Sequence, residues 1–356
     1  MIGERIKQAR FLRRMSQRDL AAKVGVSATA ISKYEKGLIT PSSHVLLKLA
    51  RVLDVRVEFF LRPALVKTIE PVFRKRRAFS RKDEKALLAH IRDWIERYLE
   101  VELILYGKPT VFEYPVGFPR PVHTWDQVEQ AALDLREAWE LGIDPIENLT
   151  QLLEDRGVKV GALRSGEAFD ACTFVVTAEG EIPVIVVKRG LPGDRMRFNL
   201  AHELGHLLLQ PAENLSPEKI AQRFAGAFLA PKPAVSFELG QHRNVLSLYE
   251  LHLLKHKYGL SMQAWIFRAR DLGIISESLF RYLNRTFRAR GWHREEPGDP
   301  YPPEHPVRFE RMVMQAFNEK LISKKRVEEL LGRSFEDFAE EVAREHGGLT
   351  VALCDG

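Results

Sequence analysis

Five consecutive residues near the middle of the chain have the types and spacing that can hold a metal ion. They read His202-Glu203-Leu204-Gly205-His206. On a helix, side chains at positions i and i+4 lie on one face, so the two imidazoles can share one tetrahedral zinc ion. Glu203 lies between them and can take a proton from a zinc-bound water, which is the chemistry of metal-dependent hydrolysis.

A catalytic zinc ion usually has three protein ligands and one water, so this motif needs a third ligand elsewhere. Downstream, the sequence predicts a helix that begins at Pro217 and ends at Pro231. Glu218 lies in its first turn, and Ala221 is small enough to let this helix approach the first one closely. Glu213 is the alternative ligand, but it lies in the connecting loop. We favour Glu218.

The elements that would position these residues form an α+β arrangement. The metal-binding helix is expected from 195 to 210, closed by Pro211. Before it, apolar periodicity and turn residues predict two helices and then three strands, at 125–139, 148–155, 158–162, 172–177 and 182–187. Residues 184–187 are the candidate for an edge strand that binds a substrate backbone, although the same run is compatible with a central buried strand.

Composition places the chain among globular proteins of two or three domains. It has 356 residues, 45% of them hydrophobic and 29% charged. No apolar run approaches the roughly 20 residues that cross a bilayer, and the first ten residues lack a signal-peptide core. The two cysteines, Cys172 and Cys354, imply no disulfide framework. We therefore expect a cytoplasmic protein without a membrane partner.

The formal net charge of +6 is distributed unevenly. Residues 1–62 contain thirteen Lys or Arg against five Asp or Glu, whereas the rest of the chain contains 41 against 43. A basic first domain on a nearly neutral body indicates a local site for a polyanion. A solvated basic face is the alternative interpretation.

Residues 1–62 have the pattern of a compact helical domain. Apolar residues recur at helical spacing in the first segment, and a short second helix is expected at 17–24, where Gly25 supplies a tight turn. Ser27 can cap a third helix that runs through Tyr34. A fourth helix follows Pro41. Two helices joined by a glycine turn at this spacing predict a DNA-binding helix-turn-helix.

The segment SQRDLAAKVGVSATAISKYEKG resembles the lambda-repressor-like (Xre-type) helix-turn-helix family, over about residues 4–61. The resemblance implies double-stranded DNA as a partner, with the third helix in the major groove and Gln17 touching the backbone. The resemblance also implies that four side chains face base edges or phosphates, namely those of Ala28, Thr29, Ser32 and Lys33. Arg10 and Glu35 are expected to form an internal ion pair. A homodimer is expected because such domains usually read two half-sites.

A second resemblance covers residues 122–290. RFNLAHELGHLLL followed by EKIAQRFAGAFLAP resembles the ImmA/IrrE family of zinc metallopeptidases, a small variant of the gluzincin plan. The resemblance implies a zinc ion bound by His202, His206 and Glu218, with Glu203 as general base and acid. It also implies a protein substrate, expected to be a transcriptional repressor or another regulatory partner.

The remaining segments connect and flank these two units. A basic run lies at 73–77, Ser80 can cap a helix expected at 81–105, and prolines dominate 295–306. Helices are expected again at 309–317 and 323–346, as a packing or partner module. The predicted divisions are a helix-turn-helix domain at 1–62, a linker with a long helix at 63–121, a metallopeptidase domain at 122–294 and a helical module at 295–356.

Together these features predict a multidomain, mainly α protein with one α+β domain built around a small sheet. The expected function is that of a DNA-binding regulator carrying a zinc-dependent endopeptidase, which cuts a protein substrate through zinc-bound water and a glutamate base. The alternative is a transcription factor or antitoxin-like regulator whose zinc domain senses or binds a partner without cutting it. Glu203 favours the enzyme, because a structural site is usually closed by a fourth protein ligand.

Overall fold

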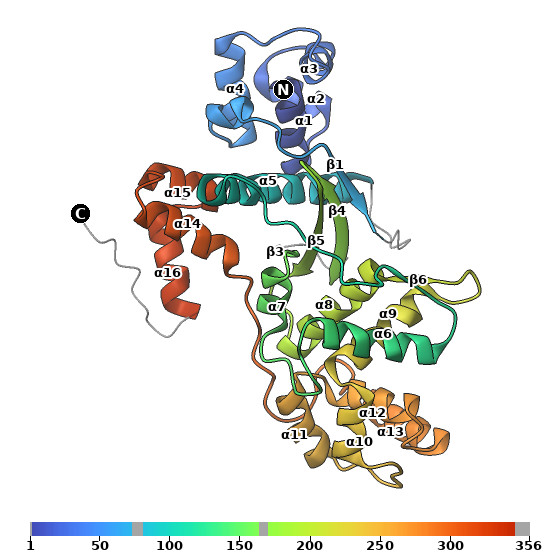
Figure 1. Cartoon of the computed structure of the whole chain (residues 1–356). Coiled ribbons are helices and arrows are strands. Elements are labelled where there is room, and N and C mark those ends of the chain that lie inside the picture. Colours follow the sequence, from blue (N-terminus) through green and yellow to red (C-terminus); the bar gives the residue numbers. More distant parts are fainter. Residues whose placement is uncertain (1, 73–80, 164–169, 346–356) are drawn as a thin grey trace.

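The computed structural model describes residues 2–72, 81–163 and 170–345. The basic run at 73–77 and Ser80 lie outside these ranges. The protein is mostly helical with a small mixed sheet, and its N-terminal helices stand apart at one end of the molecule (Figure 1). Within the described residues, no helix combines the length and the apolarity that crossing a membrane requires.

The first domain follows the sequence closely because local signals define its helix ends. It consists of α1 (Ile2–Leu12), α2 (Gln17–Val24), α3 (Ala28–Glu35), α4 (Ser43–Leu53) and the 3-10 helix η1 (Val57–Leu61). Ser16 and Asp19 form a capping box at α2, and Ser27 caps α3. Gly25 has a φ of 78°, the left-handed conformation that ends α2.

The predicted ion pair between α1 and α3 is confirmed. Arg10 donates from Nε to Glu35 Oε1 at 2.6 Å and from Nη2 to Glu35 Oε2 at 2.9 Å, and both side chains are buried. Paired guanidinium–carboxylate bonds of this kind fix orientation as well as distance. This contact therefore sets the position of α3 relative to the rest of the domain.

The four-stranded sheet has the order β1-β4-β5-β3. Its strands are β1 (Thr68–Pro71), β3 (Lys159–Leu163), β4 (Ala171–Thr177) and β5 (Glu181–Lys188). β4 is antiparallel to both β1 and β5, whereas β3 is parallel to β5. The prediction of an edge strand at 184–187 is wrong: β5 lies between β4 and β3, as the alternative interpretation allowed.

The apolar run of β5 is continuous because both faces of the sheet are covered. Ile185 and Val187 pack into the core that contains α8 (Gly193–Leu208). Val184 and Val186 pack into a second core with the long helix α5 (Arg81–Tyr106) and the C-terminal helices. A strand buried on both sides reads as an unbroken run of β-branched residues.

The metal-motif helix ends two residues before its predicted end at Gln210. Leu209 adopts an extended conformation, and β6 (Leu209–Pro211) pairs in parallel with β2 (Arg120–Val122). This short pairing redirects the chain into α9 (Pro217–Leu229). The other helices around the motif are α6 (Trp125–Ala138), α7 (Leu149–Asp155), α10 (Lys232–Leu239), α11 (Leu248–Tyr258), α12 (Met262–Asp271) and α13 (Glu277–Ala289).

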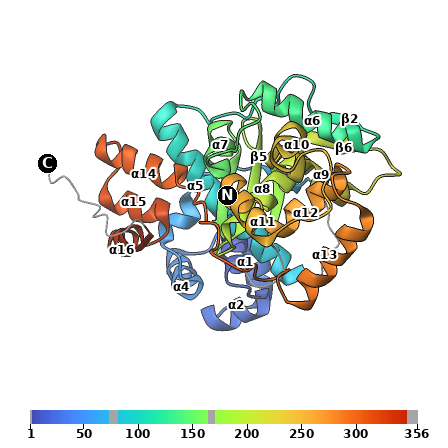
Figure 2. The same ribbon diagram turned by 90° about the horizontal axis from the view of Figure 1, so that it is seen from below.

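The C-terminal helices pack on the body of the protein. They are α14 (Arg308–Asn318), α15 (Lys324–Leu331) and α16 (Phe335–Glu345), and they lie to one side of the molecule in two perpendicular views (Figures 1 and 2). Phe309, Met312 and Val313 enter the core beneath α5. The module is therefore joined to the sheet by a shared apolar core.

Residues 295–306, expected as a proline-rich linker, are fastened to the domain by two carboxylates. Glu296 accepts from the backbone N–H groups at the start of α12 and pairs with Lys255 at 3.2 Å. Glu304 accepts from the backbone N–H groups of Leu149 and Thr150 at the start of α7 and pairs with the fully buried Arg197. We call this segment the strap.

The helix-turn-helix domain contacts the body through a second buried ion pair. Arg5 of α1 binds Glu96 of α5, and Arg5 Nε donates to the carbonyl oxygen of Arg62 at 3.3 Å. Burial raises the pKa of the Glu96 carboxyl, an effect that Arg5 opposes. Arg56 adds a contact at 3.2 Å to Glu329 of α15.

The Arg197–Glu304 pair predicts a clear stability effect. Replacing Glu304 with Ala leaves a fully buried guanidinium without its carboxylate and removes an acceptor from the start of α7. We expect the free energy of unfolding of the body to fall by about 3 kcal/mol or more, measured by urea denaturation. Glu336→Ala, at an exposed ion pair with Lys324, is the control and should leave the midpoint unchanged. Equal effects of the two variants would contradict the strap's role.

Candidate metal centre and nucleic-acid interface

The structure brings His202, His206 and Glu218 together. One ligand atom from each lies within 4.8 Å of the other two. The Nε2 atoms of the histidines are 3.1 Å apart, and they lie 3.6 Å and 3.9 Å from the carboxylate oxygens of Glu218. In a tetrahedral zinc site with bonds of about 2.0–2.1 Å, ligand atoms are about 3.3 Å apart. The donor set and its spacing therefore fit a zinc ion with one further coordination position.

The close packing of α8 on α9 makes this meeting possible. A Cβ atom at Gly205 would lie 3.2 Å from the Cα of Ala221 and 3.0 Å from the ring of Phe224. The two helices thus approach nearly backbone to backbone where the ligands converge. Ala221 was singled out from the sequence for this contact; Gly205, inside the motif itself, is its other half.

Glu203 faces the sheet side of the same helix. The hydroxyl of Thr173, on β4, donates to Glu203 Oε2 at 2.8 Å. Thr173 points toward α8 because Phe174, the next residue, points into the opposite core. Burial raises the pKa of the Cys172 thiol, and the negative charge of Glu203 raises it further. The thiol therefore stays protonated at neutral pH.

Thr173 is a site residue that the sequence reasoning missed. A strand read as apolar gives no sign that one of its hydroxyls will reach a carboxylate on a helix 30 positions later in the chain. The usable signal is the alternation of Thr173, Phe174 and Val175, which places the hydroxyl of Thr173 on the face opposite the aromatic ring.

Two side chains near the motif lie outside the ligand cluster. Glu213, the alternative ligand, is exposed in the loop after β6 and is not part of the cluster. Arg197, on the same helix as the motif, has no exposed surface and donates to the carbonyl oxygens of Ile146 and Tyr258 as well as to Glu304. Its guanidinium is committed to the strap and cannot reach a substrate.

The side chains predicted to contact DNA lie on or beside α3. Thr29 and Lys33 are exposed there, and Ala28 and Ser32 are partly exposed. Gln17 opens α2, and its amide donates to Glu35 Oε2 at 2.7 Å. Gln17 is thereby tied to the Arg10–Glu35 ion pair, so the start of α2 and the exposed face of α3 are held in one orientation.

Comparison with known proteins identifies both units. Residues 6–60 match the family described as helix-turn-helix, and residues 153–270 match the peptidase M78 family, described as IrrE N-terminal-like domain. The chain therefore combines an N-terminal Xre-type helix-turn-helix domain with an M78 peptidase-like domain, as predicted. A helix-turn-helix domain of this type implies DNA binding.

The curated relatives match a short part of the chain. Multiprotein-bridging factor 1 of Saccharomyces cerevisiae is 39% identical over 56 residues, which are 16% of this chain and 37% of the yeast protein. The prophage-derived HTH-type transcriptional regulator YonR of Bacillus subtilis is 36% identical over 62 residues, 17% of this chain and 57% of that regulator. The match thus spans less than two thirds of either relative. No solved structure matches the chain.

The close contact at Gly205 leads to a prediction about zinc affinity. Gly205→Val should push α8 and α9 apart and withdraw Glu218 from the histidines, so zinc affinity should fall by about tenfold or more. Zinc retained after dialysis against a chelator measures the effect. Gly180→Val is the matched control, because a Cβ at Gly180 meets no atom within 4 Å. Full zinc retention in Gly205→Val would show that the close approach is unnecessary.

Proposed function

We propose that this protein is a DNA-bound regulator whose second domain is a zinc-dependent endopeptidase acting on a protein, a transcriptional repressor or another regulatory partner. The observation that supports the proposal is the meeting of two imidazoles and a carboxylate that can serve as three zinc ligands, with a second carboxylate, that of Glu203, beside them. Three ligands leave one coordination position for water or substrate, the arrangement of catalytic sites, whereas structural sites are closed by four.

Each residue has a distinct task in this proposal. His202, His206 and Glu218 would hold the zinc ion, which supplies Lewis acidity toward a water molecule and a peptide carbonyl when it is bound. Glu203 takes the proton of the attacking water and delivers it to the leaving amine. Thr173 donates to Glu203 and keeps one carboxylate oxygen oriented, so the other oxygen is available for proton transfer.

The DNA-binding domain gives the peptidase a location. Arg5 and Glu96 join α1 to α5, and α5 shares its core with the sheet that supports Glu203. A peptidase fixed in this way would act close to the operator that its first domain reads. This arrangement favours a substrate that is itself found at DNA, such as a repressor.

Two substitutions separate metal binding from catalysis. Glu203→Gln should retain zinc, because Glu203 is not a ligand, and should lower the cleavage rate at least about a hundredfold through loss of the general base. His202→Ala should lose both zinc and activity. Zinc content and cleavage of repressors encoded beside this protein's own gene provide the two readouts. Undiminished cleavage by the glutamine variant would refute the role of Glu203.

Lys33 provides a test of the DNA-binding surface. Lys33→Ala should weaken binding of double-stranded DNA similarly across sequences and reduce the slope of log K against log salt by about 1, as loss of one phosphate contact requires. Fluorescence anisotropy at several salt concentrations measures this slope. Lys232→Ala, at an exposed position of α10, is the control. If neither variant changes the slope, Lys33 does not contact a DNA phosphate.

A further inference from the structure

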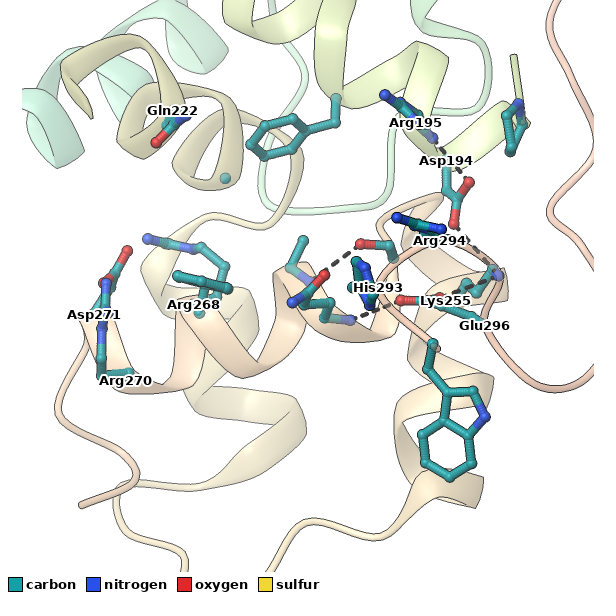
Figure 3. Close-up of a pocket in the computed structure, with 18 of the residues that line it drawn as sticks. Asp194, Arg195, Gln222, Lys255, Arg268, Arg270, Asp271, His293, Arg294 and Glu296 are labelled. Atoms are coloured by element: carbon teal, nitrogen blue, oxygen red, sulfur yellow. Dashed lines mark hydrogen bonds and ion pairs between the residues drawn. The ribbon is translucent and has the colours of Figure 1, made fainter. Parts of the chain in front are cut away.

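A cavity of about 1040 Å³ lies beside the metal centre and has no assigned role. The N-terminal part of α8, one side of α9, α12 and the strap with the residues just before it form its walls. Figure 3 shows Gln222 and Arg195 on one side of the cavity and Arg268, Arg270 and Asp271 across from them. This volume is large enough for several side chains of a bound peptide.

The helix faces that carry the candidate metal ligands continue into the wall of the cavity. On α8, Arg195 and Phe198 precede His202 by seven and four positions, so all three lie along one stripe of the helix. On α9, Gln222 follows Glu218 by four positions, one turn later. A chain lying across the metal centre and continuing along this stripe enters the cavity within about one helical turn.

Cationic groups dominate the cavity wall. Its lining residues include seven Lys or Arg against four Asp or Glu. Asp194 and Glu296 both pair with Lys255, and Asp271 pairs with Arg223 and Arg270.

Two of the cations remain available to a ligand. Lys219 and Arg294 are exposed and form no ion pair with any residue in the described ranges. Among the acidic lining residues, Glu295 is likewise exposed and forms no ion pair within those ranges. Lys219 lies on α9 beside the ligand Glu218, and Arg294 comes from the segment that leads into the strap. The two cations therefore reach the cavity from different elements, and their positive charge favours recognition of an anionic group.

Aromatic rings complete the wall. Phe198 on α8, Phe267 on α12, Trp125 at the start of α6 and Trp292 before the strap all line the cavity. Trp125 and Phe267 are 43% and 37% exposed, so both present apolar surface that a ligand can reach. Rings beside cationic groups suit a ligand that carries both an apolar side chain and a carboxylate.

We propose that this cavity is the specificity site of the peptidase, and that it binds the part of the substrate protein on one side of the cut bond through an acidic and a large apolar side chain. The inference rests on the proposed peptidase function. Lys219 and Arg294 pair with the acidic side chain, and the aromatic wall contacts the apolar one. The strap, fixed by Glu296 and Glu304, keeps the far wall in place.

Peptide binding tests this assignment separately from cleavage. Two short fluorescein-labelled peptides of equal length, differing only in Glu or Lys on both sides of a central Phe, are titrated with the zinc-loaded full chain carrying Glu203→Gln. Fluorescence anisotropy then reports binding without turnover. The Glu peptide should bind about tenfold more tightly than the Lys peptide. Adding Lys219→Glu and Arg294→Glu should abolish or invert this preference.

The matched control is Arg285→Glu with Arg288→Glu, which makes the same charge change at exposed positions of α13 outside the cavity. The preference should survive in that variant. Equal affinity for the two peptides, equal loss in the control, or binding of inorganic phosphate but of neither peptide would overturn the inference. Binding with the predicted preference but no cleavage by the wild-type chain would refute the proposed function and leave the binding site standing. Cleavage that does not depend on these charges would refute the binding site and leave the proposed peptidase function standing.

Discussion

The near contact of two helix backbones is the constraint on which this site depends. Gly205 and Ala221 let α8 and α9 approach closely enough for a first-turn carboxylate of α9 to meet two imidazoles of α8. Any larger side chain at Gly205 would meet Phe224 or the backbone of α9. The sheet contributes the other half of the site, because β4 brings Thr173 to Glu203. The candidate ligands and the candidate base are thus positioned by packing on opposite sides of one helix.

Buried ion pairs extend this rigidity to the rest of the molecule. Arg10–Glu35 orders the helix-turn-helix domain internally, and Arg5–Glu96 joins it to α5. Arg197–Glu304 fastens the strap against the start of α8, where a Cβ at Gly193 would overlap the carbonyl of Pro302. Since removing one partner of a buried pair leaves an uncompensated charge, these contacts favour a single arrangement of the parts.

Local features of the structure, and long-range contacts within the two recognisable motifs, were predictable from the sequence, whereas contacts outside these motifs were not. Ser16, Ser27 and Gly25 define the ends of α2 and α3 because caps and left-handed turns depend on neighbouring residues. The place of β5 in the sheet was ambiguous, since an apolar run fits any strand covered on both faces. Glu304 binds a backbone 155 positions away, so nothing near it distinguishes an anchored strap from a flexible linker.

The central claim is that His202, His206 and Glu218 bind one zinc ion and leave a coordination position open. X-ray absorption at the zinc edge of the purified full chain tests it most directly. The account predicts two imidazole ligands and oxygen ligands at about 2.0–2.1 Å, with no sulfur neighbour. A sulfur scatterer at about 2.3 Å, which would implicate a cysteine, or a shell of six oxygen ligands without imidazole would contradict it.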